Sequence, residues 1–325
     1  MRIRPPARAL VLPANAEGIR EAAAVLREGG LVAFPTETVY GLGSCAWDAE
    51  ATQRVFDVKG RPAGNPLIVH VADQDGLAAV AAAVPPLAQR LASQFWPGPL
   101  TLVVDAAEGL PRVTTGSLAT VAVRMPAHPA ALALLRQTGA PVAAPSANRS
   151  GRPSPTTVAH VLDDLGGQID AVLDGGPCEI GVESTVVDAR GRAPVVLREG
   201  AVTREQLGLG SAANGEADLA ASPGTRHRHY APRCRVEVTP PGQGAARATA
   251  LACSGAQVGL VATGVAGPPV RQLAQFSDAA ELGRLLYRAL RAAEDAGVDV
   301  VVIEAVDPAG IGRAVMDRVR RAAAG

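Results

Sequence analysis

The chain has 325 residues, 48% of them hydrophobic and 3% aromatic, which supplies enough apolar material for buried cores and excludes a largely disordered protein. Its 31 lysines and arginines balance its 31 aspartates and glutamates, so net charge does not favour nucleic acid as the main ligand, although a local basic cleft stays open. No apolar run approaches the ~20 residues of a membrane span, and the N-terminus lacks an apolar signal core. We therefore expect a soluble, cytoplasmic protein without membrane contact, long enough for two domains.

The cysteines are scattered along the chain and form no C-x-x-C pair; they are Cys45, Cys178, Cys234 and Cys253. Zinc sites and disulfide frameworks need patterned cysteines, so neither is predicted. Free thiols in a reducing compartment are expected instead, with no metal site built by the protein itself.

The N-terminal part of the chain alternates between helix and strand patterns. Asn15 is placed to cap the first helix, Gly29 and Gly30 to end it, and Asp48 to cap the second. Helices are predicted over residues 16–28, 49–58, 86–95, 129–137 and 157–165, with an alanine-rich helical stretch after residue 71. Strands are predicted over residues 31–34, 67–71, 100–104, 119–124, 141–144, 171–174, 183–188 and 195–198. This mixture favours an α/β or α+β sheet with functional loops at the strand ends.

A loop rich in hydroxyl groups follows the first of these strands, with the sequence Pro35-Thr36-Glu37-Thr38-Val39-Tyr40-Gly41-Leu42-Gly43. A buried strand fixes the start of such a loop, and small residues let a ligand approach its backbone. The sequence therefore predicts a binding loop here. Glu37 and Glu183 are also a candidate carboxylate pair for acid–base chemistry, but the sequence does not fix their separation.

A second loop carries two cations, Lys59 and Arg61, followed by Asn65 and by the strand that holds His70. Cations that converge with hydroxyls and backbone donors suit a polyanion such as a nucleotide triphosphate, although neither loop has the G-x-x-x-x-G-K-[ST] or G-x-G-x-x-G pattern. Less specific interpretations stay open. The cations could be a solvated helix end, His70 a core histidine, and Arg124 a surface ion-pair partner.

A third loop, over residues 145–157, combines hydroxyl groups, glycine and cations. Ser154 or Thr156 is placed to cap the helix that follows, whose first backbone amides would face a bound anion. Ser146, Ser154 and Ser184 could instead be nucleophiles. No G-x-S-x-G elbow supports that role, so caps and ligand donors are favoured.

A boundary is predicted at residues 208–221, where small and polar residues accumulate without an apolar period. The cluster Arg226-His227-Arg228-His229-Tyr230 that follows is either a solvated tether or a lid or docking segment. Beyond it, strands over residues 235–239, 258–262 and 298–303 alternate with helices, the longest over 277–296, which favours a small parallel α/β domain. The predicted divisions are a domain over residues 1–207, a linker or lid over 208–232 and a domain over 233–325.

Taken together, these stretches resemble the YrdC-like family, specifically its two-domain L-threonylcarbamoyladenylate synthase form. The resemblance runs in order through residues 35–43, 59–70, 96–100, 121–126, 145–157, 181–188 and 229–232. It implies an open, twisted mixed sheet around a concave basic cleft, with a smaller Rossmann-like C-terminal domain. The implied reaction is a nucleotidyl transfer that joins L-threonine, bicarbonate and ATP, with Mg²⁺, into threonylcarbamoyl-AMP and pyrophosphate.

The resemblance also implies roles for individual residues. Lys59 and Arg61 would be catalytic, beside the phosphates. Threonine would be bound by Thr38, His70, Arg124 and Ser184. ATP would be held by Arg61, Asn65, Thr120, Ala144, Ser146, Ser154, Arg198 and Tyr230, with the backbone contributing at Ala144. The implied partner is a separate transferase that passes the threonylcarbamoyl group to adenosine 37 of tRNA.

Two other functional classes stay open. A concave basic cleft could hold double-stranded RNA, tRNA included, in a non-catalytic module. The balanced charge and the lack of a series of stacking aromatics weigh against that as the main role. A related maturation factor that uses carbamoyl phosphate would carry cysteine-rich zinc motifs, which this sequence lacks.

Overall fold

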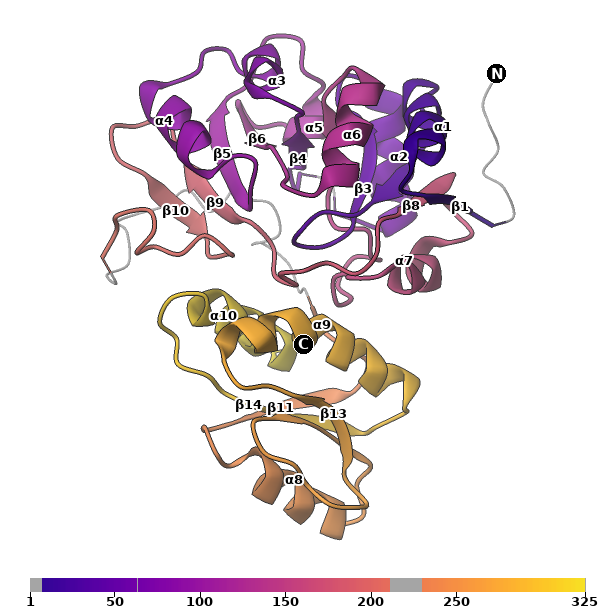
Figure 1. Ribbon diagram of the computed structural model, residues 1–325, viewed down its shortest axis with the longest axis vertical. Helices are drawn as coiled ribbons and strands as arrows, with labels where there is room; N and C mark the ends of the chain where they lie inside the picture. Colours follow the sequence, from indigo (N-terminus) through magenta and orange to yellow (C-terminus); the bar gives the residue numbers. More distant parts are fainter. Residues whose placement is uncertain (1–7, 63, 211–229, 325) are drawn as a thin grey trace. The chain divides into compact units, whose positions relative to one another are not determined.

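The computed structural model describes residues 8–62, 64–210 and 230–324. The chain divides into two compact units, each of which is described by itself (Figure 1). The N-terminal unit consists of Met1–Ser150, Pro155–Cys178 and Glu183–Arg226, and the C-terminal unit of Gly151–Ser154, Glu179–Val182 and His227–Gly325. Most of the predicted linker or lid over residues 208–232 lies outside the described residues, so its limits and its closure stay predictions.

A mixed sheet forms the centre of the N-terminal unit, in the order β1-β8-β2-β3-β7-β4-β6-β5-β9-β10. Its strands are β1 (Leu10–Pro13), β2 (Val32–Phe34), β3 (Gly41–Cys45), β4 (Ile68–His70), β5 (Leu100–Asp105), β6 (Thr120–Arg124), β7 (Val142–Ala143), β8 (Ala171–Asp174), β9 (Thr185–Asp188) and β10 (Val195–Arg198). β8 pairs in parallel with β1 and β2, β4 with β6, and β5 with β9. The other neighbours are antiparallel. The predicted mixed α/β class is therefore confirmed.

Helices of this unit begin and end at residues suited to those positions. They are α1 (Ala16–Arg27), α2 (Ala49–Lys59), α3 (Gln74–Val80), α4 (Pro86–Phe95), α5 (Arg112–Thr115), α6 (Pro129–Thr138) and α7 (Val158–Leu165). The side chains of Asn15 and Asp48 accept from the first backbone amides of α1 and α2, as predicted. Gly60 ends α2 at a φ of 59°, which glycine adopts without a steric cost. This turn starts the loop that carries Lys59 and Arg61.

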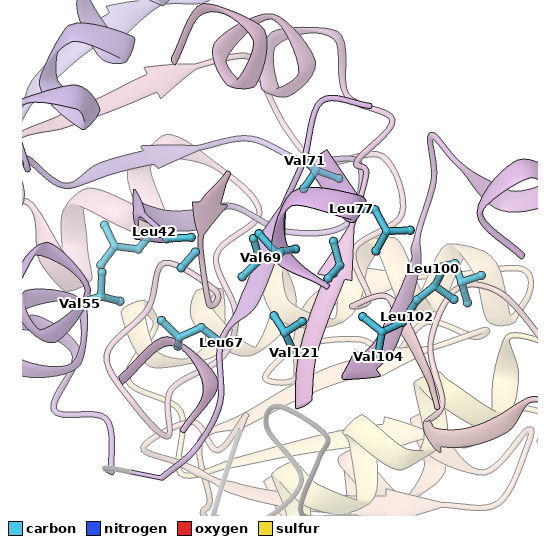
Figure 2. Packing of buried hydrophobic residues seen from close by; sticks show 14 of the residues in the cluster. Leu42, Val55, Leu67, Val69, Val71, Leu77, Leu100, Leu102, Val104 and Val121 are labelled. Atoms are coloured by element: carbon cyan, nitrogen blue, oxygen red, sulfur yellow. The ribbon is translucent and has the colours of Figure 1, made fainter. Parts of the chain in front are cut away.

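Apolar side chains cover both faces of the sheet where β2 and β8 run. Ala33 belongs to the main core, whereas its neighbours Val32 and Phe34 belong to a second cluster under α1 and α6. Figure 2 shows part of the main core, to which Val69 and Leu102 contribute from β4 and β5. Because strand residues alternate between faces, burial on both sides fixes the register of these strands.

One face of the sheet carries polar side chains at β4, β5, β6 and β9, beside a small apolar cluster that includes Ile68 and Ala122. Val123 of β6 points into the main core, so alternation places Thr120 and Arg124 on the opposite face. His70 is the register partner of Arg124, and its neighbour Val69 also points into the main core. His70, Thr120 and Arg124 therefore share one face, and the main core fixes their positions from behind.

A four-stranded parallel sheet forms the centre of the C-terminal unit, in the order β11-β14-β12-β13. Its strands are β11 (Arg235–Thr239), β12 (Val258–Ala262), β13 (Arg271–Gln275) and β14 (Val300–Glu304), and its helices are α8 (Gly244–Cys253), α9 (Ala279–Asp295) and α10 (Gly312–Ala323). Figure 1 shows α8 on one face of this sheet and α9 and α10 on the other. The predicted small parallel α/β domain is confirmed.

Two short segments from earlier in the chain pack against α9 within the C-terminal unit. Arg291 Nη2 donates to the carbonyl of Pro153 at 2.6 Å. A Cβ added to Gly181 would lie 2.5 Å from the carbonyl oxygen of Gly283, and the φ of Gly181 is +79°. Both the close approach and the left-handed conformation require glycine at position 181.

Three local predictions were wrong. Residues 41–43, predicted as the end of the binding loop, start strand β3, because Leu42 is fully buried in the main core and pairs with Ala33. Residues 112–115, for which no helix was predicted, form the short helix α5. The sequence also missed β1 and β13, whose side chains are mostly exposed or half-buried and so lack a strong apolar pattern.

The helix after the third loop is capped one residue later than predicted. Thr157, and not Ser154 or Thr156, is the N-cap of α7, and its Oγ1 accepts from the backbone amide of His160 at 3.4 Å. The prediction of an anion site at this helix end relied on a cap at Ser154 or Thr156, and the structure does not have that cap. Separately, none of the helices in the described parts of the chain combines the length and apolarity that crossing a membrane requires.

Candidate functional site

Arg124, at the end of β6, is 3% exposed, so protein groups must satisfy its guanidinium. Nη1 donates to Thr38 Oγ1 at 2.9 Å, and Nε donates to the carbonyl of Gly98 at 3.2 Å. Nη2 lies 2.7 Å from Oε1 of Glu37 in a buried ion pair. The guanidinium is thus held by the binding loop and by the turn before β5, which contradicts the alternative of a surface ion-pair partner.

Hydrogen bonds inside the binding loop fix the orientation of Thr38. Thr36 Oγ1 donates to the carbonyl of Val39 at 2.6 Å and lies 2.8 Å from Thr38 Oγ1. Because the single proton of Thr36 is used on Val39, the Thr38 hydroxyl donates to Thr36 and accepts from Arg124. The loop predicted for ligand binding is therefore ordered by its own hydroxyl groups.

His70 is a neutral histidine beside this cation. Burial, and secondly the charge of Arg124, lower the pKa of His70 from 6.5 to about 3. Its ring meets Phe34 edge to face with 5.7 Å between ring centroids. Within the described residues, Nδ1 has no hydrogen-bond partner. The threonine-binding role of His70 stays a prediction.

Ser184 lies immediately before β9 and is bound from two sides. Nε and Nη2 of Arg198 both donate to its carbonyl, at 3.2 and 2.9 Å, and Nη2 also reaches its Oγ at 3.2 Å. Thr101 Oγ1 lies 2.7 Å from the same Oγ. A Cβ on Gly200 would come within 2.2 Å of the amide nitrogen of Thr185. The chain after β10 therefore packs directly on the Ser184 backbone and holds it in place.

Lys59 organises the third loop from the end of α2. It is 3% exposed, and Nζ donates to the carbonyl of Ser146 at 2.6 Å and to the carbonyl of Asn148. Burial, followed by repulsion from Arg61, lowers the pKa of Lys59 well below 10.5, and Asp164 partly opposes this. The side chain is a buried positioning group in this structure, and not a solvated helix end.

Arg61, on the loop after α2, donates hydrogen bonds to the backbone of the same loop. Arg61 Nε donates to the carbonyl of Asn65 at 3.2 Å, and Nη2 donates to the carbonyl of Pro66 at 2.9 Å. The guanidinium carbon lies 5.9 Å from the centroid of the Phe56 ring. Asn65 itself is 1% exposed. Arg61 is thus half-buried, with its guanidinium held against the backbone of Asn65 and Pro66.

The structure connects the three predicted loops of the N-terminal unit. Gly41 forms an isolated bridge with Ser146, and a Cβ on Gly41 would lie 3.3 Å from the Cβ of Ala144. The backbone amide of Ala144 donates to Ile68 of β4 at 2.8 Å. The start of the third loop therefore lies beside the binding loop and beside the strand of His70.

Ser154 and Tyr230 belong to the C-terminal unit. Ser154 is 1% exposed. Tyr230 has a φ of 68°, stacks on Tyr287 with 5.4 Å between ring centroids, and has the guanidinium of Arg318 at 5.6 Å from its ring centroid. Their ATP-binding roles, beside the other predicted residues, stay predictions.

Known proteins resemble this chain over nearly its whole length. A family model described as telomere recombination, for the Sua5, YciO and YrdC proteins, matches residues 24–200. The chain belongs to the Sua5/YciO/YrdC family. A second model, described as the C-terminal domain of threonylcarbamoyl-AMP synthase, matches residues 194–324. The resemblance recognised in the sequence is confirmed.

Curated Sua5/YciO/YrdC relatives include threonylcarbamoyl-AMP synthases. That of Pyrococcus abyssi is 45% identical over 319 residues, covering 94% of this chain and 93% of its own length. That of Bacillus subtilis is 41% identical over 330 residues, covering 97% of this chain and 95% of its own length. The solved structure of P. abyssi Sua5 complexed with L-threonine is 43% identical, with a TM-score of 0.89 over 97% of both chains.

The structure joins most of the predicted site residues in pairs. Hydrogen bonds link Thr38 with Arg124, Ser184 with Arg198, Lys59 with Ser146, and Arg61 with Asn65, and His70 is the register partner of Arg124. The sequence-based interpretation missed Thr101, and it gave Glu37 no binding role. Alternation in the strand of Thr101 could have found that residue, since it lies on the face opposite buried Leu100 and Leu102. The acid–base pair of Glu37 with Glu183 stays a prediction, and the ion-pair partner of Glu37 is Arg124.

Proposed function

We propose that this chain is an enzyme of the nucleotidyltransferase class that joins L-threonine, bicarbonate and ATP into threonylcarbamoyl-AMP and releases pyrophosphate. The observation that carries the proposal is the buried Arg124, fixed by Thr38 and Gly98 beside the neutral His70. Such a group suits the carboxylate of an amino acid. The relatives named threonylcarbamoyl-AMP synthase, and the P. abyssi Sua5 structure complexed with L-threonine, support the same substrate.

Threonine would lie on the face of the sheet that carries His70 and Arg124. The guanidinium of Arg124 would donate to its carboxylate as a charge-assisted hydrogen-bond donor. The Thr38 and Ser184 hydroxyls and His70 would contact the rest of the amino acid. A pocket that hydrogen-bonds the substrate hydroxyl rejects valine strongly, since valine would leave those buried groups unpaired.

ATP would meet the cations of the second loop and Arg198. In the reaction, a carbamate oxygen formed on the threonine nitrogen attacks the α-phosphorus, the bond to the bridging oxygen breaks, and pyrophosphate leaves with that electron pair. The protein has little covalent chemistry to perform, so positioning and charge neutralisation can supply most of the acceleration. The triphosphate would also favour the charged form of Lys59, offsetting the burial that lowers its pKa.

Magnesium would accompany ATP. In the described parts of the chain, no group of three or more histidine, cysteine, aspartate or glutamate side chains is arranged to hold a metal ion. Mg²⁺ commonly takes its ligands from substrate phosphates, water and one or two carboxylates. Lys59 and Arg61 are cations that cannot ligate a metal, so Mg²⁺ would be held by the triphosphate itself and would share with them the neutralisation of phosphate charge.

The product would be passed to a partner. Threonylcarbamoyl-AMP is a reactive mixed anhydride, so we propose a separate transferase that moves its threonylcarbamoyl group to adenosine 37 of tRNA. Contact of this chain with tRNA belongs to the same proposal.

The proposal is tested by isotope transfer. We expect purified protein incubated with ATP, Mg²⁺, L-threonine and ¹³C-bicarbonate to form an adenylate whose mass contains both threonine and the label. The label should disappear from the product when bicarbonate is unlabelled. An adenylate that contains threonine but no bicarbonate carbon, or no adenylate at all, would contradict the proposal.

A further inference from the structure

The ion pair between Glu37 and Arg124 leaves hydrogen-bonding capacity unused on both partners. Glu37 is 6% exposed, and its Oε1 lies 2.7 Å from Arg124 Nη2. The alignment of the two groups is not that of a hydrogen bond. Neither carboxylate oxygen of Glu37, nor Nη2 of Arg124, has a hydrogen-bond partner in the part of the chain that the structure describes.

Such an arrangement costs stability when no ligand is bound. Buried polar atoms are nearly always hydrogen-bonded, and charged ones cost the most when they are not. The ion pair compensates the charge of Glu37, but Oε1 and Nη2 meet only each other, and Oε2 has no hydrogen-bond partner among the described residues. Functional sites are where proteins tolerate this, so the unsatisfied atoms point to a ligand that would satisfy them.

The rest of the guanidinium is fixed. Nη1 is bound to Thr38 and Nε to the carbonyl of Gly98, so Arg124 cannot turn toward Glu37 without breaking both bonds. Across the strand, the register partner of Arg124 is the neutral His70. The unsatisfied donor and the two unsatisfied acceptors therefore lie side by side in a rigid setting.

An α-amino acid matches this pair in charge and in hydrogen bonding. Its carboxylate needs a donor, its ammonium needs acceptors, and the two groups are attached to one carbon atom. We propose that Glu37 accepts hydrogen bonds from the α-amino group of L-threonine while Arg124 Nη2 donates to its carboxylate. This inference rests on the proposed function and adds an amine-binding residue to it.

The test separates contact with the amine from mere support of Arg124. Wild type and Glu37→Gln are titrated with L-threonine and with 3-hydroxybutanoate of the same configuration at C3, which keeps the carboxylate and the hydroxyl but has hydrogen in place of the amine. A hydrogen bond to a charged group corresponds to about 10- to 100-fold in affinity. Glu37→Gln should lose about that much for threonine and less than about threefold for 3-hydroxybutanoate.

Two further variants control for stability. Asp170→Asn removes another buried carboxylate that is paired with an arginine, Arg54, at 3.1 Å, and it should bind both ligands as wild type does. Glu37→Asp keeps the charge on a shorter side chain, so it should weaken threonine binding in the same selective way if Glu37→Gln does not fold.

Three outcomes would overturn the inference. Equal losses for both ligands would reduce Glu37 to a support for Arg124, and unchanged threonine affinity in Glu37→Gln would remove any role in binding. In both cases a wild type that binds threonine leaves the proposed function intact. A wild type that does not bind threonine would overturn the proposed function together with this inference.

Discussion

Acid should destabilise the N-terminal unit through His70. In the folded chain its pKa is about 3, against an ordinary value of 6.5, because burial and Arg124 disfavour the charged ring. As pH falls below 6.5, the unfolded chain binds a proton at this position that the folded chain does not bind. The stabilising contribution of the neutral ring is therefore complete above pH 6.5 and is lost progressively down to about pH 3.

The size of this loss of stability follows from the folded and ordinary pKa values of His70. At about 1.4 kcal/mol per pH unit, the free energy of unfolding should fall by about 2–3 kcal/mol between pH 7 and 4.5 because of His70 alone. His70→Asn keeps a polar side chain but removes the titrating ring, so the variant should lack this part of the decrease. Carboxylates also lose their charge in this range, but they do so in both proteins and cancel in the difference.

Urea unfolding followed by tryptophan fluorescence measures this free energy of unfolding at each pH. The chain has two tryptophans, Trp47 and Trp96, and both lie in the N-terminal unit, so the signal reports the unit that contains His70. The matched control is His128→Asn, because His128 is partly exposed and accepts from Ala130 N at the start of α6, a position that asparagine also suits. The reasoning is refuted if wild type and His70→Asn lose stability in parallel as pH falls.

Three further substitutions test other parts of the site. Gly200→Ala should cost several kcal/mol of unfolding free energy, since its Cβ would meet the backbone at 2.2 Å, whereas Gly191→Ala, with its nearest atom at 3.8 Å, should change urea unfolding little. Ser184→Ala should raise the KM for threonine about 5- to 30-fold, since it removes the hydroxyl that contacts Thr101 and Arg198; an unchanged KM would contradict a threonine-binding role. Arg61→Ala should lower the rate of pyrophosphate release at least about tenfold, because it removes a cation expected beside the triphosphate, and an unaltered rate would exclude that contact.

The sequence predicted most of the fold because burial and local capping decide it. Helices with clear caps, such as the one that starts after Asn15, were predicted to within one residue at each end. Strand β3 was not, because its glycines suggest a loop and only its pairing with β2 shows that it is a strand. Propensity over a few residues cannot anticipate pairing between segments that lie apart in the sequence.

The site was predictable in composition but not in its contacts. Loop sequences with Thr38, Lys59 and Arg61 indicated an anionic ligand, and the family resemblance assigned their roles. That Lys59 binds the backbone of the third loop, and that Glu37 pairs with Arg124, depends on tertiary packing between segments 87 residues or more apart in the chain. No local pattern indicates such partners.

Pyrophosphate release tests the central claim most directly. Purified protein with ATP and Mg²⁺ would be assayed with L-threonine alone, with bicarbonate alone, and with both. We predict release that requires both, since neither substrate alone supplies the carbamate that attacks the α-phosphorus. Release that is independent of either substrate, or no release by the folded protein, would contradict the synthase account.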